Sequence, residues 1–224
     1  MRTQKIRRIK KSRHNAIWQN SNNHFLSMMN VGQLEEEEIR NQLLPLSAPI
    51  APDVIGSGYR RAAVLVPIIW LDDGWHLLFT RRSDLVNDHK GQVSFPGGAL
   101  EPLDSSPTQA ALREAYEEIG LPPEDVNILG RMPDFSTTSR YVVTPVVGRI
   151  QKPFEVRLSP NEVSRAFIVP MHWLADKTNL EEKPYRSSNG VEHRVIFYKP
   201  YDGELLWGVT ARMTLLFLEL IGAV

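Results

Sequence analysis

The sequence predicts a mixed α/β sandwich, in which a mixed β-sheet lies between helices. Three observations lead to this fold class. Apolar runs rich in β-branched residues and bounded by turn residues indicate several strands, as in residues 62–70 and 141–150. A well-delimited helix at residues 107–119 stands between those strands. An apolar segment at residues 209–221 then closes the chain as a second long helix.

Length and composition fit one domain with an N-terminal extension. A chain of 224 residues can bury a substantial core. The 26 basic and 26 acidic residues balance, so the molecule as a whole is not built to bind polyanions, and nucleic acid is not an expected partner. Cysteine is absent, which excludes disulfides, thiolate zinc sites and a thiol nucleophile. No apolar run approaches the roughly 20 residues that span a bilayer, so we expect a cytoplasmic protein without a membrane partner.

The first 30 residues differ from the rest of the chain, because they contain no acidic residue and many basic ones. A basic arm of this kind could bind nucleic acid or direct import into an organelle. The alternative is a disordered tail, or an upstream extension with the natural start at Met28 or Met29. Residues 31–58 are expected to hold a short acidic helix and a linker rich in Pro and Gly, and residues 59–224 the folded domain. The basic residues of the arm are Arg2, Lys5, Arg7, Arg8, Lys10, Lys11 and Arg13.

The domain is expected to begin with a β-hairpin. Residues 62–70 form a mostly apolar run that suits a buried strand, and residues 75–80 are the returning strand. Asp72-Asp73-Gly74 between them is a typical turn sequence. We expect His76 on an edge strand, with no functional role.

The central helix has clear start and stop signals. Ser106 is expected to be its N-cap, Pro107 suits the first helical position, and Gln109 completes a capping box with Ser106. Gly120 is expected to be the C-terminal cap, with prolines just beyond it. These signals fix which residues of the helix share a face.

One side of the central helix carries three acids. Glu114, Glu117 and Glu118 stand at i, i+3 and i+4, so we expect their side chains to converge on one face. Three neighbouring carboxylates repel one another unless a cation neutralises them, and all-oxygen ligands suit Mg²⁺ or Mn²⁺. Arg113 can pair with Glu117 and orient it. The alternative is a solvated acidic face, but the Gly97-Gly98 turn favours a metal site, because glycine lets a backbone carbonyl approach a metal closely.

Residues 98–121 resemble a Nudix box, whose pattern is G-x5-E-x7-R-E-U-x-E-E-x-G-U, where U is a bulky aliphatic residue. Asp104 stands where the early Glu belongs, with one extra residue before the Arg, and the first U position holds Ala115. These departures resemble the coenzyme A pyrophosphatase branch of the Nudix hydrolases, which carries an upstream signature, L-L-T-x-R-S-x3-R-x3-G-x3-F-P-G-G. Asn87 replaces the second Arg of that signature. The matching residues are Leu78-Phe79-Thr80-Arg81-Arg82-Ser83, Gly91 and Phe95-Pro96-Gly97-Gly98, and the similarity covers roughly residues 60–222.

The resemblance implies a Nudix-type α/β/α sandwich with a mixed sheet and a catalytic loop-helix-loop. It implies metal-dependent hydrolysis of coenzyme A or an acyl-CoA to 3′,5′-ADP and 4′-phosphopantetheine or its acylated form. Glu114 and Glu118 would hold Mg²⁺ or Mn²⁺, and Glu117 would support or bridge a second ion. A carbonyl near Gly98 would complete the metal shell. Glu162 is the best candidate outside the box for a further metal ligand or general base, although it could also be a solvated acid at the start of a strand.

Cations and hydrogen-bond donors stand on both sides of the glycine turn in sequence. Arg82 and Ser83 end the first hairpin, and Lys90 and Gln92 lie in the loop that follows. Arg offers bidentate bonds to phosphate and Lys a compact charge, as a diphosphate substrate requires. We expect all four residues to bind the substrate, and Arg82 to counter the charge that develops in the transition state. Taken singly, each could be an ordinary surface residue.

The rest of the chain is expected to complete the sheet. A polar loop at 133–140 could close over the substrate, and His172 is expected to be structural. Asp202-Gly203 is a strong hairpin signal. The expected elements are strands at 126–130, 141–150 and 166–170, a short helix at 171–174, and a second hairpin in which 192–198 pairs with 204–208.

Two other functions stay open at this point. The first is a Nudix pyrophosphatase acting on nucleoside diphosphate sugars, dinucleotides or oxidised nucleotides, and Asn87 is its best support. The second is a Nudix-fold module that binds a ligand or RNA without turnover. The three intact acids of the box speak against the second, since a non-catalytic domain need not keep three carboxylates that repel one another. The oligomeric state is not indicated.

Overall fold

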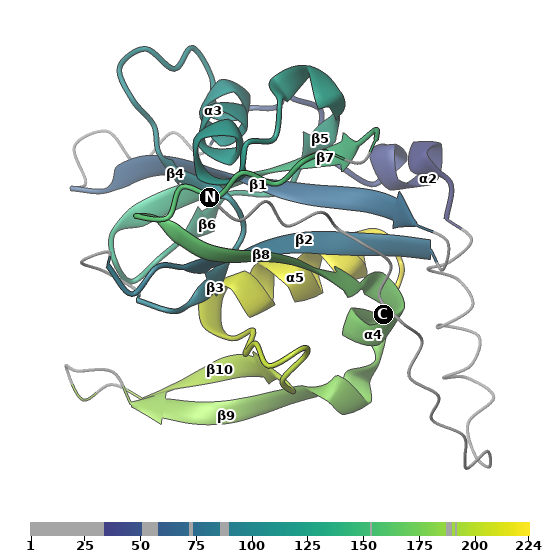
Figure 1. Ribbon diagram of the computed structural model, residues 1–224. Helices are drawn as coiled ribbons and strands as arrows, with labels where there is room; N and C mark the ends of the chain where they lie inside the picture. The colour runs from purple at the N-terminus through teal and green to yellow at the C-terminus, as the bar shows by residue number, and fades with distance from the viewer. Residues whose placement is uncertain are drawn as a thin grey trace.

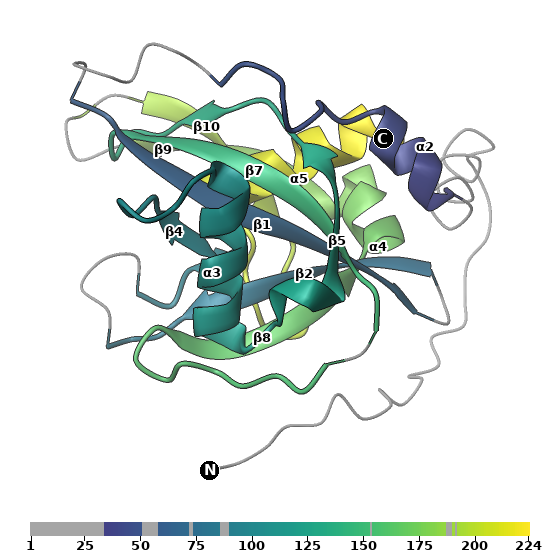
Figure 2. The ribbon, with the colours of Figure 1, turned by 90° about the horizontal axis from the view of Figure 1, so that it is seen from above.

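The structure confirms the mixed α/β sandwich. In this computed structural model, helix α3 (Pro107–Ile119) lies across one face of the sheet and helix α5 (Gly208–Leu220) across the other (Figures 1 and 2). The basic arm at residues 1–30, the Asp72-Asp73 turn and Asn87 lie outside the described residues. The structure describes residues 34–50, 58–71, 74–85, 90–152, 154–186, 190 and 192–224.

The sheet is organised around strand β1 (Arg60–Leu71). Its N-terminal half pairs with β4 (Gly97–Ala99), and its C-terminal half pairs with β2 (Gly74–Arg82), both antiparallel. The first hairpin is therefore confirmed. On the other side β1 runs parallel to β7 (Tyr141–Ile150), which makes the sheet mixed. The remaining strands of this sheet are β3 (Val93–Ser94) and β8 (Val163–Pro170), which pair with β2, and β5 (Val126–Arg131) and β6 (Phe135–Ser136), which pair with β7.

Each face of the sheet has its own hydrophobic core. On the α3 side, Ala111, Ala115 and Ile119 pack in one cluster with Leu65 of β1. On the α5 side, Phe217 belongs to a second cluster with residues of β1 and β2, and helix α4 (Met171–Ala175) contributes to it. None of the helices in the described part of the chain combines the length and apolarity needed to cross a bilayer.

The second hairpin was predicted only in part: the bridge between Phe197 and Trp207 agrees with the predicted pairing, but the main partner of residues 192–198 was missed. Strand β10 (Glu192–Tyr198) pairs along its length with β9 (Leu180–Arg186) in a separate two-stranded ribbon (Figure 1). The Asp202-Gly203 turn does form, with positive φ at both residues, but only isolated bridges follow it. The returning segment is short because α5 begins at Gly208. Strand β9 was missed because its side chains are mostly charged and exposed, without apolar alternation.

His76 was predicted on an edge strand, and this is wrong. Strand β2 lies between β1 and β8, so His76 has Ile69 on one side and Pro170 on the other. The side chain is buried, and its Nδ1 lies 2.9 Å from the carbonyl oxygen of Gly74. A strand was predicted at 166–170, where β8 spans Val163–Pro170, but its pairing with β2 could not be deduced from its own sequence.

The segment before β1 packs onto the domain. Helix α2 (Glu36–Asn41) forms where the sequence predicts a short acidic helix, and its Ile39 is fully buried in the core on the α5 side. Buried Arg131 donates hydrogen bonds to the carbonyl oxygens of Ala48 and Pro49, at 3.0 and 2.6 Å. We therefore propose that residues 34–50 belong to the folded unit and are not only a linker.

Replacing Ile39 tests this boundary. Ile39→Ala is expected to lower the free energy of unfolding by about 2–5 kcal/mol, because a fully buried aliphatic side chain leaves a cavity. Urea denaturation followed by circular dichroism measures the change. Leu46→Ala is the matched control, since Leu46 is 48% exposed, and it should stay within about 0.5 kcal/mol. Equal effects of the two variants would show that α2 adds nothing to the core.

Candidate metal centre and active site

Local signals in the sequence set the position of α3. The Ser106 hydroxyl accepts the backbone N–H of Gln109 at 3.2 Å, so the predicted N-cap is confirmed. The side chain of Gln109 instead accepts from the N–H and hydroxyl of Ser105, both at 2.7 Å, so the predicted capping box with Ser106 is not closed. Gly120 ends the helix in the left-handed conformation, with φ 71°. Because both ends of the helix are fixed, the residues that share each of its faces are fixed as well.

Three carboxylates from two distant segments, helix α3 and the loop before β8, lie close together. One oxygen each of Glu114, Glu118 and Glu162 lies within 4.8 Å of the others. Glu118 is 3% exposed, Glu114 is half-buried and Glu162 faces solvent. The backbone N–H of Ser83, at the end of β2, donates to the carbonyl oxygen of Glu162 at 2.7 Å and holds the loop before β8 against the site. The acid cluster thus joins the helix to the ends of two strands.

The carboxylates of the acid cluster repel one another. Burial first, and then the charge of Glu114, raise the pKa of Glu118 to about 8, while the positive charge of Arg82 lowers it. Burial also raises the pKa of Glu114. The buried Oε2 of Glu118 has no hydrogen-bond partner among the described residues. A hard divalent cation would bind that oxygen directly and offset the repulsion between the carboxylates. Carboxylate oxygens are the preferred ligands of such an ion, so these residues fit it.

Arg113 holds the helix to the loop that precedes it. Its Nε and Nη2 donate to the two carboxylate oxygens of Asp104 at 3.2 and 3.0 Å, and the Asp104 side chain is 2% exposed. This pairing with Arg113 holds the pKa of Asp104 below its usual range. Arg113 also donates to Glu114 and Glu117, both at 3.0 Å. Asp104 was noted in the sequence only as a departure from a pattern, and the structure gives it a definite contact.

Glu117 does not join the acid cluster. Its side chain is half-exposed and pairs with Arg113. Successive helical residues turn by about 100°, so Glu117 points well away from Glu118 although both are close to Glu114 in sequence. Glu117 lies beside Glu114, since both accept from Arg113 Nη1, and the convergence of all three acids on one site stays a prediction. The role of Glu117 with a second ion stays a prediction.

The glycine turn brings the backbone against the acids. A Cβ atom on Gly98 would lie 2.4 Å from Oε1 of Glu114, and one on Gly97 would lie 2.4 Å from the carbonyl oxygen of Ala63. The backbone of Gly97 also hydrogen-bonds Glu118. Only glycine fits at Gly97, where the nearest atoms belong to the backbone, whereas a side chain at Gly98 would displace the carboxylate of Glu114. Gly98 is thus beside the acid cluster, and its carbonyl as a metal ligand stays a prediction.

The four predicted substrate residues occupy different environments. Arg82 is half-buried beside the cluster, and its Nε has no hydrogen-bond partner among the described residues. Its N–H donates to the carbonyl oxygen of Gln92 at 2.9 Å, which places Gln92 in the same corner. The Ser83 hydroxyl is buried and accepts the N–H of Leu85 at 3.2 Å. Lys90 is exposed. Of these four residues, Arg82 is therefore the one whose charge acts on the acid cluster.

The contact between Asp104 and Arg113 yields a prediction. Asp104→Asn is expected to lower turnover and metal affinity about 10- to 100-fold, because residues that orient metal ligands typically matter by that factor. Steady-state kinetics and Mg²⁺ or Mn²⁺ titration measure both quantities. Glu101→Gln is the control: Glu101 is 59% exposed and 3.9 Å from Arg113, so its loss should change neither quantity more than about twofold. If Asp104→Asn kept the turnover and metal affinity of the wild type, the pair of Asp104 and Arg113 would not orient the metal ligands.

Comparisons with known proteins show what this chain is similar to. The family model of the NUDIX domain matches residues 59–189. An uncharacterized Nudix hydrolase NudL from Photorhabdus laumondii is 40% identical over 168 residues, which cover 74% of this chain and 87% of that protein. The protein of the same name from Yersinia pestis is 38% identical over 152 residues, or 68% and 75% of the two chains. Among solved structures, an Ap4A hydrolase binary complex from C. elegans is 21% identical, with a TM-score of 0.43, over 50% of this chain and 80% of its own.

Proposed function

Because this chain belongs to the Nudix hydrolase family, we propose that its substrate is coenzyme A or an acyl-CoA. The reaction releases 3′,5′-ADP and 4′-phosphopantetheine or its acylated form. The observation that carries the proposal is the meeting of two sequence motifs at one point. Arg82, from the upstream signature, lies beside Glu118 of the box, and its charge lowers the pKa of that acid. The coenzyme A pyrophosphatase branch resembles this chain in both motifs.

The acids are the residues that would hold a metal. Nudix hydrolases generally use divalent metals such as Mg²⁺ or Mn²⁺. Glu114 and Glu118 would hold the ion, with the carbonyl of Gly98 as a further ligand, and Glu117 would support a second one. When bound, the ion would neutralise phosphate charge and lower the pKa of a water molecule, so that its deprotonated form can attack phosphorus. Arg113 orients Glu114 and Glu117 through its hydrogen bonds to both.

The remaining site residues act on the substrate. Glu162 is the exposed member of the acid cluster, so it is the acid that can take a proton from the attacking water and release it to solvent. Water attacks one phosphorus, the bond from that phosphorus to the bridging oxygen breaks, and the other phosphate leaves. Arg82, which is half-buried beside Glu118, donates to the phosphate oxygens. Ser83, Lys90 and Gln92 bind the rest of the diphosphate.

Product analysis tests the substrate. We expect mass spectrometry to find 3′,5′-ADP and 4′-phosphopantetheine in equal amounts after incubation with coenzyme A and Mg²⁺ or Mn²⁺. Glu118→Gln should abolish both products. Glu124→Gln, which removes an exposed acid outside the cluster, should leave them unchanged. Intact coenzyme A beside a cleaved NDP-sugar or dinucleotide would overturn the substrate while keeping the hydrolase, and would give Asn87 a role in specificity. No cleavage in any well would favour a module that binds without turnover.

A further inference from the structure

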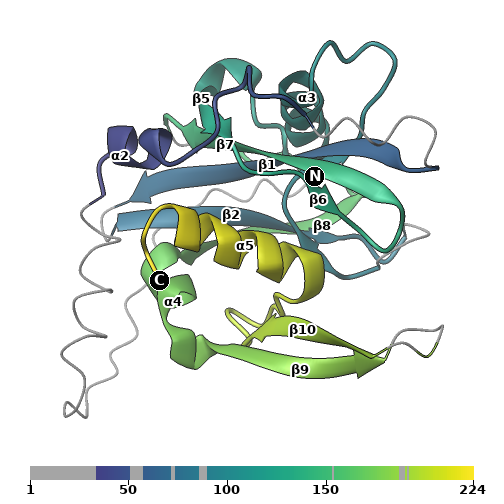
Figure 3. The ribbon, with the colours of Figure 1, turned by 180° about the vertical axis from the view of Figure 1, so that it is seen from behind.

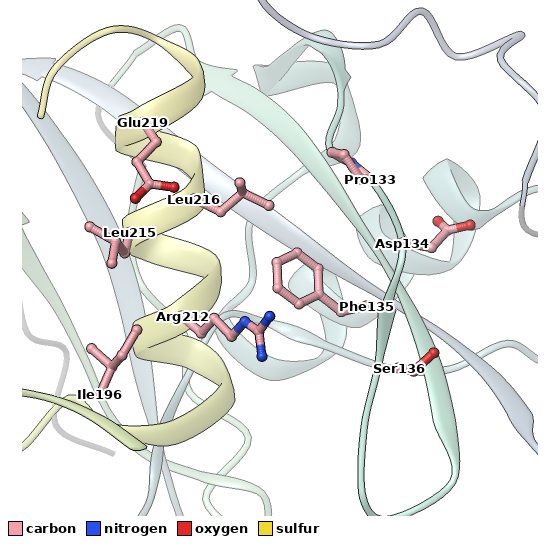
Figure 4. A pocket seen from close by; sticks show the side chains of 9 residues that line it. All are labelled: Pro133, Asp134, Phe135, Ser136, Ile196, Arg212, Leu215, Leu216 and Glu219. Atoms are coloured by element: carbon pink, nitrogen blue, oxygen red, sulfur yellow. The ribbon is translucent and has the colours of Figure 1, made fainter. Parts of the chain in front are cut away.

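A cavity of about 550 Å³ opens on the face of the sheet opposite the acid cluster. Its floor is the outward side of α5, and its walls are the segment 133–136, which includes β6, and Ile196 of β10 (Figures 3 and 4). The volume falls within the range of about 300–1,000 Å³ that is usual for small-molecule sites. Helix α3, with its acids, covers the other face of the sheet (Figure 3). The cavity is therefore separate from the metal centre.

The middle of the cavity is apolar. Four residues of α5 line it at helical spacing, and the two central ones, Leu215 and Leu216, are only half-buried. Phe135 and Ile196 face them from the two walls (Figure 4). The outward face of a surface helix is usually polar, whereas the middle of this face of α5 is apolar. Leu216, Phe135 and Ile196 also pack against the core on this side of the sheet. An apolar ligand body would cover this surface.

The two ends of the cavity carry opposite charges. Arg212 extends from α5 toward Phe135, and within the described ranges no ion pair or hydrogen bond occupies its guanidinium (Figure 4). Glu219 lies seven residues along the same helix, a rise of about 10 Å. The hydroxyl of Tyr198, which does not line the cavity, is buried without a partner among the described residues, and burial first, then the charge of Glu219, raise its pKa. A ligand that fits has an anion at one end and a hydrogen-bond donor at the other.

We propose that this cavity binds a small aliphatic hydroxy acid. Its carboxylate pairs with Arg212, whose planar guanidinium matches a carboxylate in two parallel hydrogen bonds. Its apolar chain lies on Leu215 and Leu216, and its distal hydroxyl donates to Glu219. The Cα atoms of the two charged residues are about 10 Å apart along the helix axis, and the probes below carry an eight-carbon chain of similar length. This site does not depend on the substrate proposed above.

Calorimetric titration of the full-length protein with three probes tests the site. We expect 8-hydroxyoctanoate to bind with a Kd below about 1 mM, octanoate to bind about fivefold more weakly because it lacks a donor for Glu219, and octylamine not to bind. Arg212→Gln should weaken both acids at least about tenfold, since it removes a charge-assisted contact. Glu219→Gln should remove the preference for the hydroxy acid. The control is Arg186→Gln, at an exposed cation outside the cavity, which should change nothing.

Each titration is run with and without Mg²⁺. Binding that does not depend on the ion supports the cavity, whereas binding that requires Mg²⁺ would place the acid at the metal centre and overturn the proposal. Affinity unchanged in Arg212→Gln, or no heat from either acid with the wild-type protein, would overturn it equally. Because Arg212 and Glu219 are exposed, neither variant should disturb folding, and circular dichroism checks this. Product analysis with coenzyme A is a separate measurement, so the two proposals can fail independently.

Discussion

Glu118→Gln lowers kcat about 10³-fold or more, and this is the largest effect on activity that we expect. The amide keeps the size of the carboxyl group but removes the most buried charge of the acid cluster. Metal-assisted charge stabilisation contributes several kcal/mol to such reactions, and each 1.36 kcal/mol is about a tenfold change in rate. Steady-state kinetics with saturating Mg²⁺ or Mn²⁺ measures the loss, and a metal titration separates weak binding from slow turnover.

Glu117→Gln is the comparison variant on the same helix. Its side chain is half-exposed and pairs only with Arg113 among the described residues, so we expect a loss of about tenfold. If Glu117→Gln were as damaging as Glu118→Gln, the second ion would be as important as the first. If Glu118→Gln kept wild-type turnover, the acid cluster would not be the metal site.

The metal-free protein is expected to lose stability as the pH rises from about 5 to 9. Burial raises the pKa of Glu118 to about 8 in the folded chain, whereas an unfolded Glu titrates near 4.3. The folded state therefore binds more protons between these values, so this contribution is fully present below the unfolded pKa and is lost as the pH rises through 8. Between pH 5 and 9 the effect on the free energy of unfolding is on the order of 4 kcal/mol, at about 1.36 kcal/mol per pKa unit, or roughly 8–16 °C in Tm for a chain of this size.

Thermal unfolding in EDTA across that pH range measures the effect. The Tm of the wild type should fall relative to that of Glu118→Gln, because the amide cannot ionise. Adding Mg²⁺ should restore the wild-type Tm at pH 8–9 and should do little for the variant. Parallel Tm curves for the two proteins in EDTA would contradict a raised pKa at Glu118.

Features set by neighbouring residues could be predicted from the sequence. The ends of α3 follow from Ser106 and Gly120, which act within one turn, and the first hairpin follows from its apolar strands and turn residues. Two of the three clustered acids, Glu114 and Glu118, follow from helical spacing alone. Once helix α3 forms, Glu114 and Glu118 lie close together.

Features set by distant pairing could not be predicted in the same way. Strand β9 has no apolar alternation, because one charged strand of an exposed ribbon can be stabilised by its partner. The burial of His76 depends on β8, nearly a hundred positions later in the chain. Asp104 meets Arg113 only because the loop before α3 folds back on it. Glu162 could be named as a candidate, but its place in the acid cluster depends on the backbone bond from Ser83.

The position of α5 has a consequence for cutting the chain into smaller pieces. The family model ends at residue 189, before this helix begins. A fragment comprising residues 59–189 would keep α3 and two of the clustered acids on that helix, yet it would uncover Leu77 and Phe79 of β2, which share a hydrophobic cluster with Phe217 of α5. It would also lose Ile39 from the same cluster. Such a fragment would contain the whole Nudix box but lack one half of its hydrophobic core. It is expected to aggregate when expressed alone, because the apolar surface left by that half is exposed.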